Sequence, residues 1–256
     1  MILRGREMQR LLVLGGNGYV GQNIIRAALD SGKFSVASLS RSGKPSNPGP
    51  CLANAEMMDK VEWLEGDIFD AQRRDETFEG VDVIVSTIGA FGSNDFMEKI
   101  CGDASVEAVD TAVKHNVSRF GFVSSAQVGG SMKFSPSFPL YGYFKGKEKA
   151  EAAITQAFPE AHAILRPGFV YGPRMAGAIG PLPLHLIGAP VSFVSTQLGP
   201  VSSLIQSIPF VGTECGSMVP VHAVSKAMIH GVSDEPPKGL TLSASDIRKY
   251  SMLDPQ

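Results

Sequence analysis

The chain has little of what several large classes of protein depend on. Its 256 residues contain only three cysteines, Cys51, Cys101 and Cys215, which are far apart and odd in number. Their spacing fits neither a disulfide framework nor a metal site, so we expect no metal and a reducing compartment. No apolar run reaches the about 18 residues that a membrane-crossing helix needs, so no transmembrane span is expected.

Charge is also sparse. Charged residues make up 19% of the chain, hydrophobic residues 43%, and the formal net charge is −2. Because no run of five basic residues occurs, the composition argues against nucleic acid as a partner. The hydrophobic content is ample for the core of one large domain. Arg4, Arg6 and Arg10 form a stretch too short for a full transit peptide, but it fits the remnant of one.

One long segment has no Asp, Glu, Lys or Arg at all. It runs from Met175 to Thr213 and is rich in Leu, Ile, Val and Phe, broken by Pro and Gly. Two interpretations stay open. These residues are the core of a small substrate-side subdomain, or they form an apolar pocket or docking surface for an apolar ligand, a membrane face or a partner protein.

The most informative feature that is present is a glycine-rich turn. The apolar run Leu11–Leu14 leads into Gly-x-x-Gly-x-x-Gly at Gly15, Gly18 and Gly21, and a helical pattern follows at once. In such a turn the first glycine allows the tight bend, the second lets a pyrophosphate approach the backbone, and the third lets helix and strand pack closely. The N-terminus of the new helix then binds phosphate, so the segment predicts a nucleotide site.

The rest of the pattern alternates strand and helix. Strands are expected at Leu11–Leu14, Val36–Leu39, Val61–Leu64, Val81–Ser86, Phe120–Ser124 and Ala163–Leu165. Helices are expected at Gly18–Ser31, Phe96–His115 and Lys145–Phe158, the last with Lys147 and Glu151 spaced to pair on one face. Short apolar strands between helices predict an α/β fold with a doubly wound parallel sheet of the Rossmann type. We expect a nucleotide-binding domain over 1–172 and an integrated apolar substrate-side or docking segment over 173–256.

The end of the second strand indicates which nucleotide binds. A site for NAD usually has an acidic residue here for the ribose hydroxyls, whereas this chain has Ser40, Arg41 and Ser42. A cation between two hydroxyls suits a 2′-phosphate, so the pattern favours NADP(H), with a solvated basic loop as the alternative.

Two further strand ends add candidate cofactor residues. Asp67 and Ile68 follow the third strand, where a carboxylate can accept a hydrogen bond from the adenine amino group. The alternative for Asp67 is a helix N-cap or turn aspartate. Ile88, Gly89 and Ala90 follow the fourth strand and predict a floor of small residues beside the cofactor.

A tyrosine and a lysine four residues apart follow the fifth strand in two overlapping registers. The pairs are Tyr141 with Lys145 and Tyr143 with Lys147. In either register a lysine ammonium can lower the pKa of the phenol and hold the nicotinamide ribose, and the phenol can donate a proton to a carbonyl. Ser124 or Ser125, at the end of the fifth strand, can polarise the same carbonyl.

Several of these segments resemble the extended and atypical short-chain dehydrogenases/reductases. The resemblance lies in Val13–Gly21, in Leu165–Gly172, in Val219–Val224 and in Tyr143, Lys147 and Glu151 read as Tyr-x-x-x-Lys-x-x-x-Glu. It implies Tyr143 as the acid, Lys147 as its modulator and Ser125 as the polarising residue. It also implies cofactor contacts from Asn17, Tyr19, Val20, Lys147, Pro167, Gly168, Phe169 and Val170.

Leu39–Gly43 and Gly89–Asn94 resemble an organellar plant and algal branch of that family. This branch is related to a mitochondrial coenzyme Q biosynthesis protein and to the Rossmann-fold accessory subunit of respiratory complex I. The resemblance implies a mitochondrial location at the matrix side of the inner membrane, with the plastid as the alternative. The charge-free segment 175–213 in turn suggests an apolar or quinone-like small molecule as the partner of the site.

The chain departs from the family where active members carry Asn-x-x-Gly-Thr, because Lys99 stands in place of the asparagine that supports a proton relay. Two hypotheses follow. One is an NADP(H)-dependent oxidoreductase acting on an apolar carbonyl or quinone. The other is a non-catalytic subunit that holds NADPH and docks on a membrane-associated complex, such as complex I, through 175–213.

Overall fold

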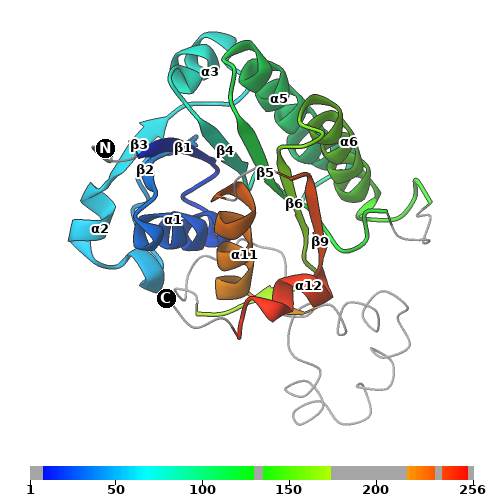
Figure 1. Cartoon of the computed structure of the whole chain (residues 1–256). Coiled ribbons are helices and arrows are strands. Elements are labelled where there is room, and N and C mark those ends of the chain that lie inside the picture. The colour runs from blue at the N-terminus through cyan, green and yellow to red at the C-terminus, as the bar shows by residue number, and fades with distance from the viewer. Residues whose placement is uncertain (1–7, 130–134, 174–217, 234–237, 253–256) are drawn as a thin grey trace.

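The computed structural model describes residues 8–129, 135–173, 218–233 and 238–252. Its centre is a parallel sheet of seven strands in the order β3-β2-β1-β4-β5-β6-β9 (Figure 1). The strands are β1 (Gln9–Leu14), β2 (Phe34–Ser40), β3 (Val61–Glu65), β4 (Val83–Ser86), β5 (Arg119–Val123), β6 (His162–Arg166) and β9 (Leu240–Ser243). The order reverses direction between β1 and β4, as in doubly wound dinucleotide-binding sheets, so the predicted fold class is confirmed.

Helices cover both faces of this sheet (Figure 1). One face carries α1 (Tyr19–Ser31) and α11 (Val221–Ser233), and the other carries α3 (Ala71–Phe78), α5 (Ala104–Lys114) and α6 (Tyr141–Ala157). The short α2 (Ala55–Asp59) follows a 3₁₀ turn, η1 (Pro50–Leu52), and α12 (Ala244–Lys249) follows β9. Because each helix is apolar along the stripe that meets the sheet, two separate cores form, one on each face.

Strand β1 lies at the centre of these cores. Leu11, Leu12, Val13 and Leu14 are all fully buried, with alternate side chains in opposite cores. A strand covered on both faces reads as a continuous apolar run, which is why the sequence pattern locates it clearly. Leu11 pairs with Val36 of β2 and with Val83 of β4, so the three strands run in register.

The long helix expected at Phe96–His115 is present, but it is not α-helical throughout. The structure has α4 (Asn94–Glu98), a π-helical turn η2 (Lys99–Asp103) and then α5. The wider turn occurs where α6 crosses closely: a methyl group added at Gly102 would lie 2.9 Å from the Cα atom of Gly146. Residue periodicity does not report such a local change of helix type.

Four elements toward the C-terminal end were not predicted as such. Strand β9 extends the main sheet beside β6, α12 begins with a Ser243–Asp246 capping box, and β7 (Val170–Tyr171) pairs with β8 (Val219–Pro220). Because β9 has four residues, none of them fully buried, its apolar pattern is weak. The apolar segment from Met175 to Thr213 lies outside the described residues, so the expected boundary at 172 stays a prediction. No helix in the described part of the chain is long and apolar enough to cross a membrane.

The crossing of α4 and α6 depends on glycine. The Asn94 side-chain oxygen accepts a hydrogen bond of 2.9 Å from the Gly142 amide, and a methyl group at Gly142 would overlap the Asn94 carbonyl oxygen. Since the obstacle is backbone, a larger residue could fit only if the two helices moved apart.

We therefore expect Gly142→Ala to lower the free energy of unfolding by about 1–3 kcal/mol, the usual cost of overpacking. Helix propensity alone predicts the opposite, a gain of up to about 1 kcal/mol. Urea unfolding distinguishes the two. Glu148→Ala, on the exposed side of the same helix, is the control and should change stability by less than about 0.5 kcal/mol. A stabilised Gly142→Ala variant would contradict the proposed crossing.

Candidate functional site

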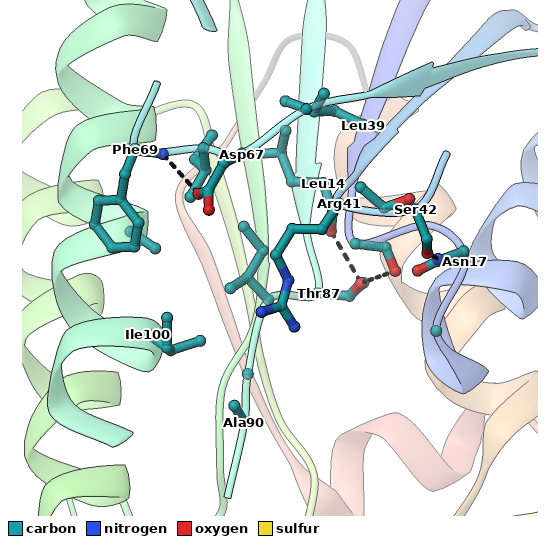
Figure 2. Close-up of a pocket in the computed structure, with 18 residues that line it drawn as sticks. Leu14, Asn17, Leu39, Arg41, Ser42, Asp67, Phe69, Thr87, Ala90 and Ile100 are labelled. Carbon is teal, nitrogen blue, oxygen red and sulfur yellow. Dashed lines mark hydrogen bonds between the residues drawn. The ribbon is translucent and has the colours of Figure 1, made fainter. Parts of the chain in front are cut away.

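A pocket of about 300 Å³ opens at the carboxyl ends of β1, β2 and β4, where the strand order reverses (Figure 2). Crevices at this point of an open α/β sheet are where ligands bind. The lining residues are Leu14, Gly15, Asn17, Gly18, Leu39, Ser40, Arg41, Ser42, Gly66, Asp67, Ile68, Phe69, Thr87, Ile88, Gly89, Ala90, Ile100 and Ala104. Eleven of these were predicted as cofactor residues from the sequence: Gly15, Asn17, Gly18, Ser40, Arg41, Ser42, Asp67, Ile68, Ile88, Gly89 and Ala90.

The glycine-rich turn has the geometry that its sequence predicts. Gly15 has a φ of +79°, which residues other than glycine rarely adopt. Its amide donates to the Leu39 carbonyl at 2.9 Å. The Gly18 amide then donates to Gly15 at 3.0 Å, which closes the turn before α1 begins. Thr87 supports the turn from β4, since its hydroxyl lies 3.0 Å from the Leu14 carbonyl oxygen. At Gly21 a methyl group would lie 2.5 Å from the Gly15 carbonyl oxygen, so this glycine allows close helix packing.

Arg41 is the cation of this pocket. Its exposed side chain points from the end of β2 into the pocket (Figure 2), and no carboxylate in the described part of the chain pairs with it. Beside it, the Asn17 side-chain amide donates to the Ser42 hydroxyl at 2.6 Å. The Ser40 hydroxyl instead donates to the Gly43 carbonyl at 3.0 Å, so it stabilises the turn that follows β2. Arg41 and Ser42 therefore remain the groups available to a phosphate.

Asp67 lines the pocket and also forms a turn. Its carboxylate accepts a hydrogen bond of 3.0 Å from the Phe69 amide (Figure 2). The N-cap of α3 is Asp70 and not Asp67. Of the two alternatives to an adenine contact, Asp67 therefore matches the turn aspartate. The Lys99 ammonium lies 5.1 Å from the centroid of the Phe69 ring, which places this lysine outside the pocket floor.

The wall of the pocket opposite the glycine-rich turn was not predicted from the sequence. Ile100 of η2 and Ala104 of α5 face the pocket opposite the glycine-rich turn (Figure 2 labels Ile100). Their spacing of four residues on one helix face was the available signal, but it is the same signal that any core-facing helix gives.

The structure separates the two tyrosine–lysine registers. Lys145 is exposed and forms an ion pair with Glu98 at 3.0 Å. Lys147 is buried, and its ammonium donates to the Ile88 carbonyl at 3.0 Å and to the Val123 carbonyl at 2.8 Å. This lysine therefore joins the carboxyl ends of β4 and β5 directly below the pocket floor.

Burial lowers the pKa of Lys147 from 10.5 to about 8, and Cys101 and Glu151 oppose the shift. The ammonium also lies 4.5 Å from the centroid of the Phe122 ring, which favours its charged form. At neutral pH the group is therefore a cation, although close to the pH at which it loses its proton.

Tyr143 lies one turn before Lys147 on α6. Its ring stacks on Phe91 with centroids 5.2 Å apart and meets Phe144 edge-on at 5.4 Å. The Lys147 ammonium is 5.9 Å from the centroid of the Tyr143 ring. The phenol is thus held between two aromatic rings, within range of a positive charge.

The end of β5 also separates the two candidate serines. The Ser124 hydroxyl donates a short hydrogen bond to Glu151, whereas Ser125 is 8% exposed and has no such assigned partner in the described residues. The expected pairing of Lys147 with Glu151 was wrong, because the buried Glu151 forms an ion pair at 2.5 Å with Arg166, which is partly exposed. This ion pair raises the pKa of Arg166 and joins α6 to β6.

Other residues predicted for the cofactor lie outside the lining of this pocket. Val20 and Val170 pack against the core, and the carbonyls of Pro167 and Phe169 accept hydrogen bonds from Ala126 and Val219. The remaining ones are Tyr19 and Gly21 in α1, Lys147 below the floor, and Gly168 in the turn after β6. Their contact with a cofactor stays a prediction.

The residues present fit a dinucleotide. A glycine turn with a positive φ, a helix N-terminus and a cation without an acidic partner among the described residues converge on one crevice, which is what phosphate groups require. The end of β2 carries Arg41 and no acidic residue. The hydrogen-bond donors at this strand end therefore also fit a 2′-phosphate.

Comparison with known proteins also indicates a dinucleotide site. Residues 15–179 match the NAD(P)H-binding family model. An uncharacterized chloroplastic protein of Arabidopsis thaliana is 34% identical over 229 residues, which cover 90% of this chain and 73% of that protein. Component 2 of the MIOREX complex of Saccharomyces cerevisiae is 34% identical over 34% of this chain and 30% of its own length.

Solved structures share the fold at low identity. The UDP-glucuronic acid 4-epimerase of Bacillus cereus, solved with NAD, has a TM-score of 0.63 at 14% identity and covers 93% of this chain and 81% of its own. The UDP-N-acetylglucosamine 4-epimerase of Methanobrevibacter ruminantium has a TM-score of 0.62 at 17% identity, over 93% and 77% of the two chains. At such identities the likeness concerns the fold, whereas the family match spans the site itself: the chain belongs to the NAD(P)H-binding family of Rossmann-type proteins.

Proposed function

We propose that this protein is an NADP(H)-dependent oxidoreductase of the atypical short-chain type, acting on an apolar carbonyl or quinone-like substrate. The observation that carries the proposal is the buried Lys147 ammonium between the ends of β4 and β5, with Tyr143 one turn away. The maize isoflavone reductase homolog, 31% identical over 33% of this chain, adds support for a reductase.

The cofactor would lie along the crevice. Gly15, Asn17 and Gly18 would face its pyrophosphate, Arg41 and Ser42 its 2′-phosphate, and Asp67 its adenine. The nicotinamide, when bound, supplies or accepts the hydride.

Lys147 and Tyr143 would then handle the proton. An ammonium has three donors, and two of those of Lys147 bind carbonyls, so one remains for a ligand hydroxyl. A positive charge beside the phenol would favour proton transfer from Tyr143 to a substrate oxygen. Ser125 would donate to the same oxygen, because Ser124 is engaged with Glu151.

A second candidate is a non-catalytic subunit that holds NADPH and docks on a membrane-associated complex. Two observations favour it: Lys99 lies over Phe69 where active relatives have a relay asparagine, and the yeast MIOREX component is a partial relative. Its docking surface would be the segment 175–213, and its bound cofactor would stabilise the fold without turnover.

We propose an organellar location, in the plastid rather than the mitochondrion. The Arabidopsis relative that covers 90% of this chain is named as chloroplastic. The yeast relative, a component of the MIOREX complex, covers only 34% of this chain and carries less weight.

Arg41→Ala should raise the Kd for NADPH about 10- to 100-fold, because a charged hydrogen bond of about 1.5–3 kcal/mol to the 2′-phosphate is lost. The Kd for NADH should change less than about threefold, since that cofactor has no such phosphate. Cofactor fluorescence titration measures both. Lys44→Ala is the control, because Lys44 lies in the same loop but pairs with Asp59. Equal losses for both cofactors would contradict the assignment.

Tyr143→Phe keeps the aromatic stack and removes only the hydroxyl, so it should lower kcat at least about 100-fold without changing the Kd for NADPH. Oxidation of NADPH by short-chain quinones and apolar carbonyls measures this. Tyr141→Phe, in the other register, should keep full activity. A wild-type protein that binds NADPH and oxidises it with none of these substrates would instead support the docking subunit.

Lys147 should make stability depend on pH. Its folded-state pKa is about 8 and its ordinary value is 10.5, so between these values the unfolded chain binds more protons. The free energy of unfolding should therefore rise with pH across this window, by about 3 kcal/mol at most. Urea unfolding of the wild type and of Lys147→Met at pH 8, 9 and 10 isolates the effect, because other groups cancel. A difference that stays constant with pH would show that the lysine remains charged throughout.

A further inference from the structure

Gln22 is a buried polar side chain in α1 that no part of the proposed chemistry uses. It is 6% exposed, and both the nitrogen and the oxygen of its amide form hydrogen bonds with backbone groups. Its nitrogen donates to the Asn17 carbonyl at 2.8 Å, and its oxygen accepts from the Gly49 amide at 2.6 Å. One side chain thus joins the glycine-rich turn to the far end of the loop that follows β2.

A second contact turns this link into a ring. The Asn17 side-chain amide donates to the Ser42 hydroxyl at 2.6 Å, next to Arg41 (Figure 2). The path from Ser42 along the chain to Gly49, through Gln22 to Asn17 and back to Ser42 is therefore closed. Arg41 lies directly beside this ring, in a turn that the Gly43 amide closes by donating to the Ser40 carbonyl at 3.2 Å, so the ring links this turn to the glycine-rich turn.

Few other contacts hold the middle of this loop. At one end of this loop the Ser40 hydroxyl donates to the Gly43 carbonyl, and at the other end the Leu52 amide donates to the Gly49 carbonyl at 2.9 Å. Between these two ends the described side-chain contact is the ion pair of Lys44 and Asp59, at 3.3 Å between exposed groups. Such pairs contribute little to stability.

The turn itself has independent support. The Gly15 amide binds the Leu39 carbonyl, the Gly18 amide binds the Gly15 carbonyl, and Thr87 binds Leu14. None of these bonds involves Gln22. Loss of the Gln22 amide should therefore loosen the loop more than the turn.

We infer that Gln22 is a positioning residue for recognition of the 2′-phosphate, holding the loop 41–49 against the glycine-rich turn so that Arg41 and Ser42 are placed before the cofactor binds. The inference rests on the proposed NADP(H) function. Its physical basis is preorganisation, because a loop already held in its bound position loses less conformational freedom on binding. Gln22 thus sets the preference for NADPH over NADH without touching either cofactor.

The test is Gln22→Met, which keeps the length of the side chain and leaves the Asn17 carbonyl and the Gly49 amide without this partner. We expect the Kd for NADPH to rise about tenfold and that for NADH less than about threefold. The matched control is Asn23→Leu, because among the described residues the Asn23 side-chain amide donates to the Tyr19 carbonyl, within α1. It should leave the ratio of the two Kd values unchanged.

The experiment distinguishes a failure of the proposed NADP(H) function from a failure of the role proposed for Gln22. A wild type that binds neither cofactor, or shows no preference for NADPH, fails the proposed function before any variant is made. If the wild type prefers NADPH and Gln22→Met keeps that preference, or weakens both cofactors equally, the positioning role of Gln22 is overturned.

Gln22→Glu provides an independent readout. Its carboxylate keeps an acceptor for Gly49 but has no donor for Asn17, and on protonation the donor returns. The NADPH affinity, taken relative to wild type at each pH, should therefore recover as the pH falls from 8 to 5. A defect that does not recover would contradict the role of the Gln22–Asn17 hydrogen bond.

Discussion

The site depends first on the burial of β1 between β2 and β4. Because Leu11–Leu14 is apolar on both faces, the strand can exist only where helices cover both sides, and it pairs with a parallel neighbour on each edge. The crossover from β1 to β2 runs through α1 on one face of the sheet, and the crossover from β3 back to β4 runs through α3 on the other face. Their separation opens the crevice at the carboxyl ends, so the location of the pocket follows from the packing of four residues.

A second constraint brings the proposed chemistry to the same edge. Helix α6 can place Lys147 below the pocket floor only because Gly142 and Gly146 let it approach α4 and η2 at backbone distance. The lysine, once buried, has to satisfy its donors, and the carbonyls of Ile88 and Val123 do so. The same bonds fix the ends of β4 and β5, so a single buried cation serves both the stability of the strand ends and the candidate site.

The sequence predicted those parts of the fold whose signal is local. The glycine turn, six of the seven sheet strands and the positions of Arg41 and Lys147 all follow from short patterns with a direct physical meaning. The π turn at Lys99–Asp103 and the strand β9 did not, because each depends on contacts between distant segments. The pairing of Glu151 was wrong for the same reason: helix spacing offers Lys147, whereas the fold brings Arg166 across from β6.

The two cations of the site operate in different electrostatic regimes, and this difference argues for different roles. Arg41 is an exposed guanidinium, so its contribution depends on where the loop holds it. Lys147 is buried, so its pKa falls to about 8, and its charge becomes sensitive to any group placed beside it. An anchor for a fixed phosphate needs the first property. A group that assists proton movement needs the second, and the fold supplies each at the end of the crevice where the proposed reaction would require it.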